Sequence, residues 1–362
     1  MEELDGFLVD FPTLGDIGEA WIRQHCRVPD GHRRGAEFVW SDWQFWCAAK
    51  YYQVRPGVEW GVGEAGEPEP LFNQAFVYRR AQVVAPQKTG KGPWAASLTC
   101  LEAVGPSQFY GWAEKGDGYA CSEWGCGCGW EYEYLPGEAM GMRHPSPVIQ
   151  LTANNEDQVG NVYRPLTAMI RLGPLSDLMF PREGFIRIAG EAGGDDFDRI
   201  DAVTSSARGR LGNPVSWVLH DETGLYTVNN KMVGVAETQR RGAAGMGGRT
   251  LETTNAWDPS QNSTAQRTYE SQATDIFKFF RIPPKNLSWG NKRDRRRILK
   301  YVYAGSPWVN IDSIEAEALE LNETDPAQAE RFFGNRLVYG QGSWLRDGLW
   351  EGQYAAALAA QS

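Results

Sequence analysis

One short segment, residues 83–92, combines the residue types that can hold a phosphate group. An apolar run ends at Ala85, and a loop with a Gly90-Lys91 pair follows directly before a helical pattern. The backbone N–H groups of such a loop, the positive end of a helix and one lysine ammonium together bind the β- and γ-phosphates of a nucleotide. We expect these contacts to come from Pro86, Gln87, Lys88, Thr89, Gly90, Lys91 and Gly92, with Lys91 as the phosphate lysine.

The segment departs from the full phosphate-loop pattern at two positions. Ala85 stands where the pattern has Gly, and Gly92 stands where it has the Ser or Thr whose hydroxyl binds Mg²⁺. Taken alone, the segment is therefore a weak signal. With Gly at position 92, a water or another oxygen has to complete the magnesium shell.

A second segment, residues 215–222, is typical of a buried strand that ends in two carboxylates, Asp221 and Glu222. In phosphoryl-transfer enzymes with a phosphate loop, an acid on a neighbouring strand holds Mg²⁺, and a second acid orients and deprotonates the attacking water. We assign Asp221 to the first role and Glu222 to the second. A surface turn before Thr223-Gly224 is the alternative. The two segments together favour a nucleotide site, because both follow predicted strands at the end where such folds bind ligands.

A third polar segment, Thr253-Thr254-Asn255, ends the predicted strand 249–253 about thirty residues after the acids. In sheet-based motor ATPases, side chains at this place sense the terminal phosphate and couple its presence to a moving element. A plain strand end followed by a turn is the alternative.

These segments need a parallel sheet to bring them together. Apolar runs alternate with amphipathic stretches, which implies an α/β fold whose sheet is covered on both faces and joined by right-handed crossovers. The predicted strands are 81–85, 148–152, 185–189, 215–220 and 249–253. One predicted helix starts at Ser41 or Asp42. The other predicted helices cover 93–103, about 155–170, 231–241 and 266–280.

The chain divides into two predicted parts. Residues 1–280 form a P-loop ATPase domain with a turn-rich insertion at about 105–147, and residues 281–362 form a small helical linker subdomain. Asp325-Pro326 predicts a helix start, and Gly334 its end. The second part begins with a basic stripe, which is either a phosphate contact or an ordinary solvated helix face: Arg281, Lys285, Lys292, Arg293, Arg295, Arg296, Arg297 and Lys300.

Composition sets limits on the function. The 362 residues are 42% hydrophobic and carry a net charge of −10, so a wholly basic nucleic-acid-coating protein is excluded. No apolar run is long enough to cross a bilayer, and the N-terminus is acidic where a signal peptide is basic. We therefore expect a soluble protein without a membrane partner.

Three cysteines cluster in the insertion: Cys121, Cys126 and Cys128. A zinc knuckle with His144 as the nearest fourth ligand is one interpretation. The spacing lacks the paired Cys-x-x-Cys arms of such sites, so a glycine- and aromatic-rich surface hairpin is favoured.

In chain order, these segments resemble the large terminase subunit of tailed bacteriophages, the motor that pumps viral DNA into a preformed capsid. Trp43-Gln44 resembles the adenine-reading glutamine motif, and residues 85–91 resemble the divergent phosphate loop. His220-Asp221-Glu222 resembles the second motif, and residues 253–255 resemble the coupling motif. Segments 151–159 and 331–336 are also similar to terminase segments.

The resemblance implies an ATPase that uses ATP and Mg²⁺ to move double-stranded DNA, as a homo-oligomeric ring in the host cytoplasm. By the same resemblance, its partners are the portal protein and the small terminase subunit. An arginine must stabilise the charge that develops on the γ-phosphate, and Arg164, Arg171 and Arg210 are unranked candidates. Large terminases also carry a C-terminal nuclease, which would begin near the end of this chain, so we expect an ATPase region without nuclease activity.

Two other functions remain open. A helicase or recombination translocase would need aromatic stacking platforms along a basic groove, and the Trp-rich segments near Trp40 and Trp124 allow one. A non-catalytic assembly protein, which binds nucleotide only to set its shape, is favoured by Gly92.

Overall fold

A computed structural model describes residues 7–62, 68–154, 156–189, 197–204 and 214–340. Asn155, which was expected in a helix cap, and the arginine candidate Arg210 lie outside these residues. So does the end of the predicted C-terminal part, residues 341–362.

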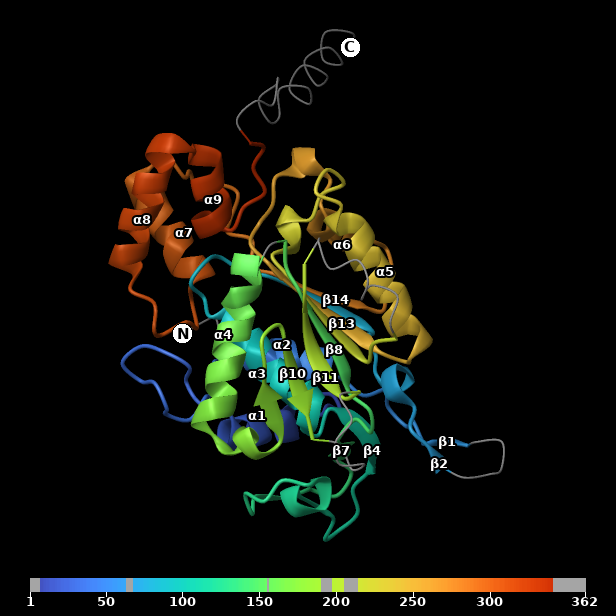
Figure 1. The fold of residues 1–362 in the computed structure, drawn as a ribbon. Helices are drawn as coiled ribbons and strands as arrows, with labels where there is room; N and C mark the ends of the chain where they lie inside the picture. The colour runs from blue at the N-terminus through green and yellow to red at the C-terminus, as the bar shows by residue number, and fades with distance from the viewer. Residues whose placement is uncertain (1–6, 63–67, 155, 190–196, 205–213, 341–362) are drawn as a thin grey trace.

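The centre of the molecule is an eight-stranded sheet in the order β14, β3, β13, β12, β8, β11, β10, β9 (Figure 1). The strands from β14 to β11 pair in parallel, and β10 and β9 add an antiparallel edge. This mainly parallel sheet confirms the α/β prediction. The strands are β3 (Arg80–Val84), β8 (Val148–Thr152), β9 (Met179–Pro181), β10 (Phe185–Ile188), β11 (Arg199–Val203), β12 (Trp217–Asp221), β13 (Arg249–Thr254) and β14 (Ile276–Phe280).

Helices cover both faces of this sheet (Figure 1). One face carries α1 (Gly15–His25), α2 (Asp42–Tyr51), α3 (Lys91–Val104) and α4 (Glu156–Leu172). The other carries α5 (Met232–Gly245) and α6 (Thr264–Glu270). Both β12 and β13 are buried along their whole length, as expected for strands covered on both sides.

One predicted helix is wrong. Residues 266–280 were expected to be a single helix, but α6 ends at Glu270 and β14 begins at Ile276. Ile276-Phe277-Lys278-Phe279-Phe280 is an apolar and aromatic run, which suits a strand, and it pairs in parallel with β3. Helix α1 was not anticipated, because the first forty residues gave no clear pattern.

The insertion after α3 lies outside the central sheet, at the lower edge in Figure 1. It forms two small antiparallel pairs, β4 (Gln108–Trp112) with β7 (Ala139–Met142) and β5 (Gly118–Ala120) with β6 (Glu131–Glu133). A short 3-10 turn, η3 (Cys121–Trp124), follows β5. A further pair, β1 (Gly61–Val62) with β2 (Pro68–Glu69), precedes β3.

After β14 the described chain is helical, as predicted, with α7 (Lys292–Val302), α8 (Ile311–Thr324) and α9 (Pro326–Gly334). Asp325 caps α9 by accepting from the Gln328 N–H at 2.9 Å, and Asn335 ends the helix in the left-handed conformation. These helices bury side chains from Leu287 to Phe333 in a cluster of their own. Among the described helices, none has the length and apolar character needed to span a membrane.

Candidate nucleotide-binding site

The loop between β3 and α3 has the tight backbone that a phosphate site needs. Lys88 and Gly90 both have positive φ angles, of 68° and 86°. Thr89 closes the turn, because its hydroxyl donates to the Pro86 carbonyl at 2.8 Å. At Gly90, a Cβ atom would lie 2.9 Å from the Trp308 ring, so only glycine fits both the backbone and the contact.

The Lys91 ammonium lies inside this loop and is only 6% exposed. It donates to the carbonyls of Ala85 and Pro86 at 2.8 and 3.0 Å, and to Asn255 Oδ1 at 2.8 Å. Burial lowers the pKa of Lys91, while the nearby charges of Glu222 and Asp221 raise it. The lysine and the two acids therefore share one electrostatic site.

Asp221 ends β12, and its buried carboxylate accepts from the Thr253 hydroxyl at 2.7 Å. Burial, followed by the charge of Glu222, raises the pKa of Asp221 to about 7. Glu222 is half-buried and has a φ of 56°. It accepts from the side-chain amide of Asn255 at 3.2 and 3.1 Å and from the Asn255 backbone N–H at 3.3 Å.

The predicted coupling residues connect these groups. Asn255 accepts from Lys91 and donates to Glu222, so one amide joins the phosphate loop to an acid. Thr254 accepts from the Gly224 backbone N–H at 2.9 Å, just beyond the acids. The acid strand is not the immediate neighbour of β3, as the sequence had suggested, because β13 lies between β3 and β12. The phosphate loop and the acids are therefore connected through Asn255, which follows the intervening strand β13.

A close approach of two helices explains the unexpected Gly92, the second residue of α3. A Cβ atom on Gly92 would lie 2.8 Å from the backbone carbonyl oxygen of Asn161, in α4. A hydroxyl side chain at position 92 would therefore require α4 to move.

Carboxylate oxygens suit Mg²⁺, and here the Asp221 and Glu222 side chains offer them beside the buried Lys91.

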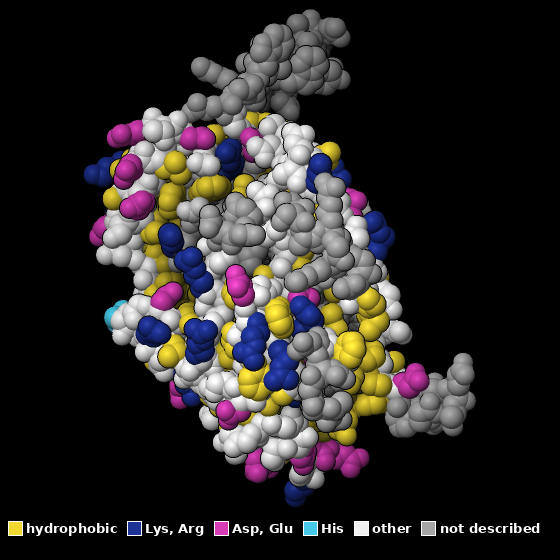
Figure 2. Space-filling model, in the orientation of Figure 1, with side chains coloured by type: hydrophobic (Ala, Val, Ile, Leu, Met, Phe, Trp, Pro, Cys, Tyr) yellow, Lys and Arg dark blue, Asp and Glu magenta, His cyan; other side chains and the backbone are white. Residues whose placement is uncertain are grey.

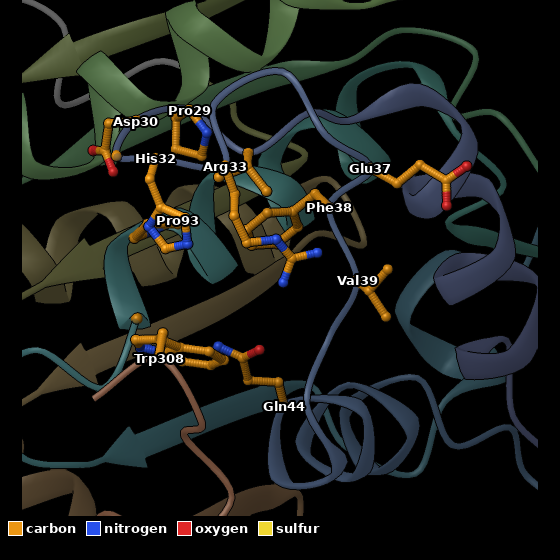
Figure 3. A pocket seen from close by; sticks show the side chains of 13 residues that line it. Pro29, Asp30, His32, Arg33, Glu37, Phe38, Val39, Gln44, Pro93 and Trp308 are labelled. Carbon is orange, nitrogen blue, oxygen red and sulfur yellow. The ribbon is translucent and has the colours of Figure 1, made fainter. Parts of the chain in front are cut away.

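A pocket of about 310 Å³ adjoins the phosphate loop (Figure 3). The predicted adenine-reading residue, Gln44, lies in its wall beside Trp308, and its Oε1 accepts from the Ser41 backbone N–H at 3.0 Å. The Gln44 Nε2 lies near Gly90, 3.3 Å from the place of a Cβ. The remaining wall is formed by Val28, Pro29, Asp30, Gly31, His32, Arg33, Glu37, Phe38, Val39 and Pro93.

Sequence reasoning missed two parts of this pocket. The segment 28–39 carries no recognisable motif, although it brings the Arg33 side chain to the pocket (Figure 3). Trp308 lies between α7 and α8, more than two hundred residues from the loop that it contacts. Its only signal was an aromatic side chain after a Gly-Ser-Pro turn.

The C-terminal helices are hydrogen-bonded directly to the phosphate loop. The Gln87 backbone N–H donates to the Phe332 carbonyl at 2.9 Å, and the Tyr303 hydroxyl donates to the Gln87 carbonyl at 2.9 Å. The Trp308 indole N–H donates to the Lys88 carbonyl at 3.4 Å. The loop is thus held from the side of α7–α9 as well as by the sheet.

The arginine candidates are placed differently. Arg164 and Arg171 are exposed on α4, and Arg164 lies one turn beyond Asn161, which faces Gly92. Among the described contacts, neither bonds to Lys91, Asp221 or Glu222. Arg331, on α9, lies closer to the acids, because it lines a small cavity of about 90 Å³ together with Glu222 and Asn255.

The basic stripe is only partly available for phosphate contacts. On α7, Arg296 is paired with Asp312 and Glu315. Arg281, just after β14, donates to the Ala304 carbonyl at 2.7 Å. A surface hollow is still lined by Lys292, Arg293, Arg296, Arg297 and Lys300. Figure 2 shows a second group of Lys and Arg side chains over α4 and the antiparallel edge of the sheet, where Arg164, Arg171 and Arg182 are exposed.

Comparison with known proteins finds one distantly similar sequence and several solved structures with a similar fold. No protein-family model matches the chain. The chain is 24% identical over 336 residues to the "Gene 13 protein" of Mycobacterium phage D29, which covers 84% of this chain and 50% of that protein. Among solved structures, it is similar to the HK97 bacteriophage large terminase, with a TM-score of 0.56 and 15% identity over 90% of this chain and 55% of that one.

The large terminase of a thermophilic bacteriophage, solved in complex with ADP, is also similar, with a TM-score of 0.42 and 9% identity over 74% of this chain and 51% of that one. The similarity to the HK97 large terminase shows that this chain has the fold of the matched 55% of that protein. The chain spans about half the length of these relatives.

Proposed function

We propose that the chain binds ATP with Mg²⁺ and hydrolyses it, as the motor part of a machine that packages double-stranded viral DNA. One observation supports this most strongly: Lys91, Asn255 and Glu222 form a continuous chain of bonds across the carboxyl ends of β3, β13 and β12. In parallel α/β sheets, this edge is where ligands bind. The similarity to the HK97 large terminase supports the packaging role.

In this proposal, each part of the site has one task. The 310 Å³ pocket takes the nucleoside, with Gln44 against the base. The loop 86–91 takes the phosphates, and Lys91 exchanges a carbonyl partner for phosphate oxygen. Asp221 would hold Mg²⁺, and the ion would supply positive charge to the phosphates. Glu222 orients the attacking water and accepts its proton.

The coupling step would begin at Asn255. This residue contacts both the phosphate lysine and the acid that handles water, so its position depends on whether a terminal phosphate separates them. When Glu222 turns toward the water, its hydrogen bonds to Asn255 break. The resulting movement of Asn255 passes the change in phosphate state to β13. Arg164, Arg171 and Arg210 remain the candidates for the charge-stabilising arginine, and we add Arg331, which lines the small cavity beside Glu222.

We further propose the partners implied by packaging. Duplex DNA would contact basic surfaces through its phosphates, with a strong dependence on salt concentration. The portal protein, a small terminase subunit and neighbouring copies in a ring would complete the machine, in the host cytoplasm. The division into a P-loop ATPase domain, 1–280, and a helical linker, 281–362, is part of this proposal.

Phosphate release by the purified chain, measured with and without duplex DNA, tests the function. Turnover that needs Mg²⁺ and rises with duplex, without strand separation, is the expected result. Unwinding of a forked substrate would instead favour a helicase. Stoichiometric nucleotide binding without turnover in either condition would favour a non-catalytic assembly protein.

A further inference from the structure

Four side chains with metal-binding atoms converge at one place outside the nucleotide site: His25, Cys121, Cys126 and Cys128. Their ligand atoms all lie within 4.8 Å of one another. His25 is the last residue of α1, whereas the cysteines belong to the insertion about one hundred residues later. The fourth member is therefore not His144, as the sequence had suggested, since His144 accepts from the Ser146 N–H instead.

Hydrogen bonds to His25 cannot account for all three of its sulfur contacts. The sulfur atoms of Cys121, Cys126 and Cys128 lie 3.3, 3.7 and 3.2 Å from the His25 Nε2. The other ring nitrogen, Nδ1, faces the Trp21 carbonyl at 2.7 Å and therefore carries the proton. Nε2 then has a single lone pair, which can accept from one thiol but not from three.

We propose that these four residues bind a zinc ion. One ion at the centre gives every sulfur and the nitrogen a partner at once. A tetrahedral site with Zn–S of about 2.3 Å and Zn–N of about 2.0 Å has sulfur–nitrogen edges of about 3.5 Å. The three distances to Nε2 lie on either side of this value. Three thiolates and an imidazole are the soft and borderline ligands that select zinc.

The surroundings are those of a structural rather than a catalytic ion. His25, Cys121 and Cys126 are buried, and four protein ligands leave no open position. The Trp21 carbonyl fixes the imidazole tautomer, as outer-shell partners of zinc ligands commonly do. The Trp130 backbone N–H donates to the Cys128 sulfur at 3.5 Å, and the Trp21 ring stacks on His25 with centroids 4.3 Å apart.

Local backbone structure explains how cysteines without Cys-x-x-Cys spacing reach one point. Cys121 is the first residue of the η3 turn, and Gly125, with a φ of 81°, reverses the chain after it. The Cys126 N–H then donates back to the Cys121 carbonyl at 3.0 Å. This turn places two sulfurs together, and Cys128 follows on the return path toward β6.

The site would fix the start of the nucleotide pocket. Residues 28–39, which begin three residues after His25, form much of the wall around Gln44. By holding the end of α1 to the insertion, the ion would fix where that segment begins. The zinc site itself does not depend on ATP being the ligand of the pocket.

Metal analysis of the whole chain, purified without chelators, tests the proposal directly. We expect about one tightly held zinc per chain after dialysis, with the content falling at least severalfold in His25→Ala and Cys126→Ser. The control is Cys47→Ser, which also changes a buried free cysteine but lies outside the cluster. This variant should keep its zinc.

Cobalt substitution of the unaltered chain gives a readout that does not need the variants to fold. We expect the visible bands of tetrahedral cobalt together with sulfur-to-cobalt charge transfer, lost on addition of zinc. A chain that purifies folded without zinc, gives no such spectrum and leaves all three thiols open to alkylation would overturn the proposal. A disulfide between two of these cysteines, found by mass spectrometry of the native chain, would do the same.

Discussion

Asn255 donates its side-chain amide to both carboxylate oxygens of Glu222, at 3.2 and 3.1 Å. The oxygen of the same amide accepts from Lys91. Replacing Asn255 with Ala removes both contacts, so we expect the ATP turnover rate to fall by about tenfold to a hundredfold, while the KM for ATP changes less. Steady-state phosphate release measures both. Asn229→Ala, at an exposed position, is the control, and an unchanged rate in Asn255→Ala would remove this residue from the coupling step.

Changes at the two charged groups should separate binding from chemistry. Glu222→Gln keeps an acceptor for Asn255 but cannot take a proton, so we expect nucleotide binding to persist and turnover to fall by about a hundredfold or more. The Lys91→Ala variant should lose both nucleotide binding and turnover. Nucleotide titration and phosphate release measure the two effects, with the exposed Glu183→Gln as control. Undiminished hydrolysis in either variant would contradict the assigned role.

The acid at the end of β12 should make magnesium binding depend on pH. Because the pKa of Asp221 is raised to about 7, protons compete with the metal near neutrality. We expect the apparent Mg²⁺ affinity in ATPase assays to weaken as pH falls from about 8 to about 6, unlike that of an Asp with an ordinary pKa. Magnesium titrations at both pH values test this. A constant affinity would exclude Asp221 as the titrating ligand.

The same pKa predicts a stability effect without magnesium. A raised pKa means that the folded chain holds this proton more tightly than the unfolded chain does. The contribution to stability is full below the ordinary value of 3.8 and is lost as pH rises through about 7. Asp221→Asn should therefore gain free energy of unfolding relative to the unaltered chain between these pH values. Urea unfolding at several pH values measures it, and parallel curves for the two chains would refute it.

Trp308 should matter for nucleotide affinity more than for the chemical step. It forms a wall of the pocket and contacts Gly90, whereas neither Asp221 nor Glu222 lines that pocket. We expect Trp308→Ala to weaken nucleotide binding by about tenfold, or ~1.4 kcal/mol, at a nearly unchanged maximal rate. Calorimetric titration and steady-state kinetics measure the two. Tyr110→Ala removes an aromatic ring of similar exposure from the insertion and should leave the affinity unchanged.

Gly92 should resist the residue that the usual pattern prescribes. Because a Cβ there would lie 2.8 Å from the Asn161 carbonyl, we expect Gly92→Ser to lower the free energy of unfolding by about 1–3 kcal/mol. Urea unfolding measures the loss. Gly234→Ala is the matched control, because a Cβ on that helix meets nothing within 4 Å and should be neutral or stabilise by ~0.5–1 kcal/mol. A fully stable Gly92→Ser would argue against the tight packing of α3 on α4.

Local patterns in the sequence predicted the elements that carry the site. The helix α4 follows from apolar residues at helical spacing, and the start of α9 follows from Asp325-Pro326. The segments 86–91, 221–222 and 253–255 meet because the carboxyl ends of parallel strands lie at one edge of the sheet, which the α/β pattern already implied.

Contacts between distant segments were beyond the reach of such patterns. Trp308 and the segment 28–39 enter the pocket through packing of separate elements, which no local spacing encodes. His25 was missed as a partner of the cysteines for the same reason, because α1 and the insertion meet only in the folded chain. Ile276 to Phe280 was misjudged because a short apolar run fits a helix and a strand equally well until its neighbour, β3, is known.

The three hydrogen bonds that join residues 87 and 88 to Phe332, Tyr303 and Trp308 have a mechanical consequence. Any displacement of this loop by an incoming phosphate must either pull the last helices along or break its links to them. The position of the phosphate loop around Lys91 and the orientation of α7–α9 are therefore mechanically coupled. A force applied to those helices should change the rates at which the loop opens and closes.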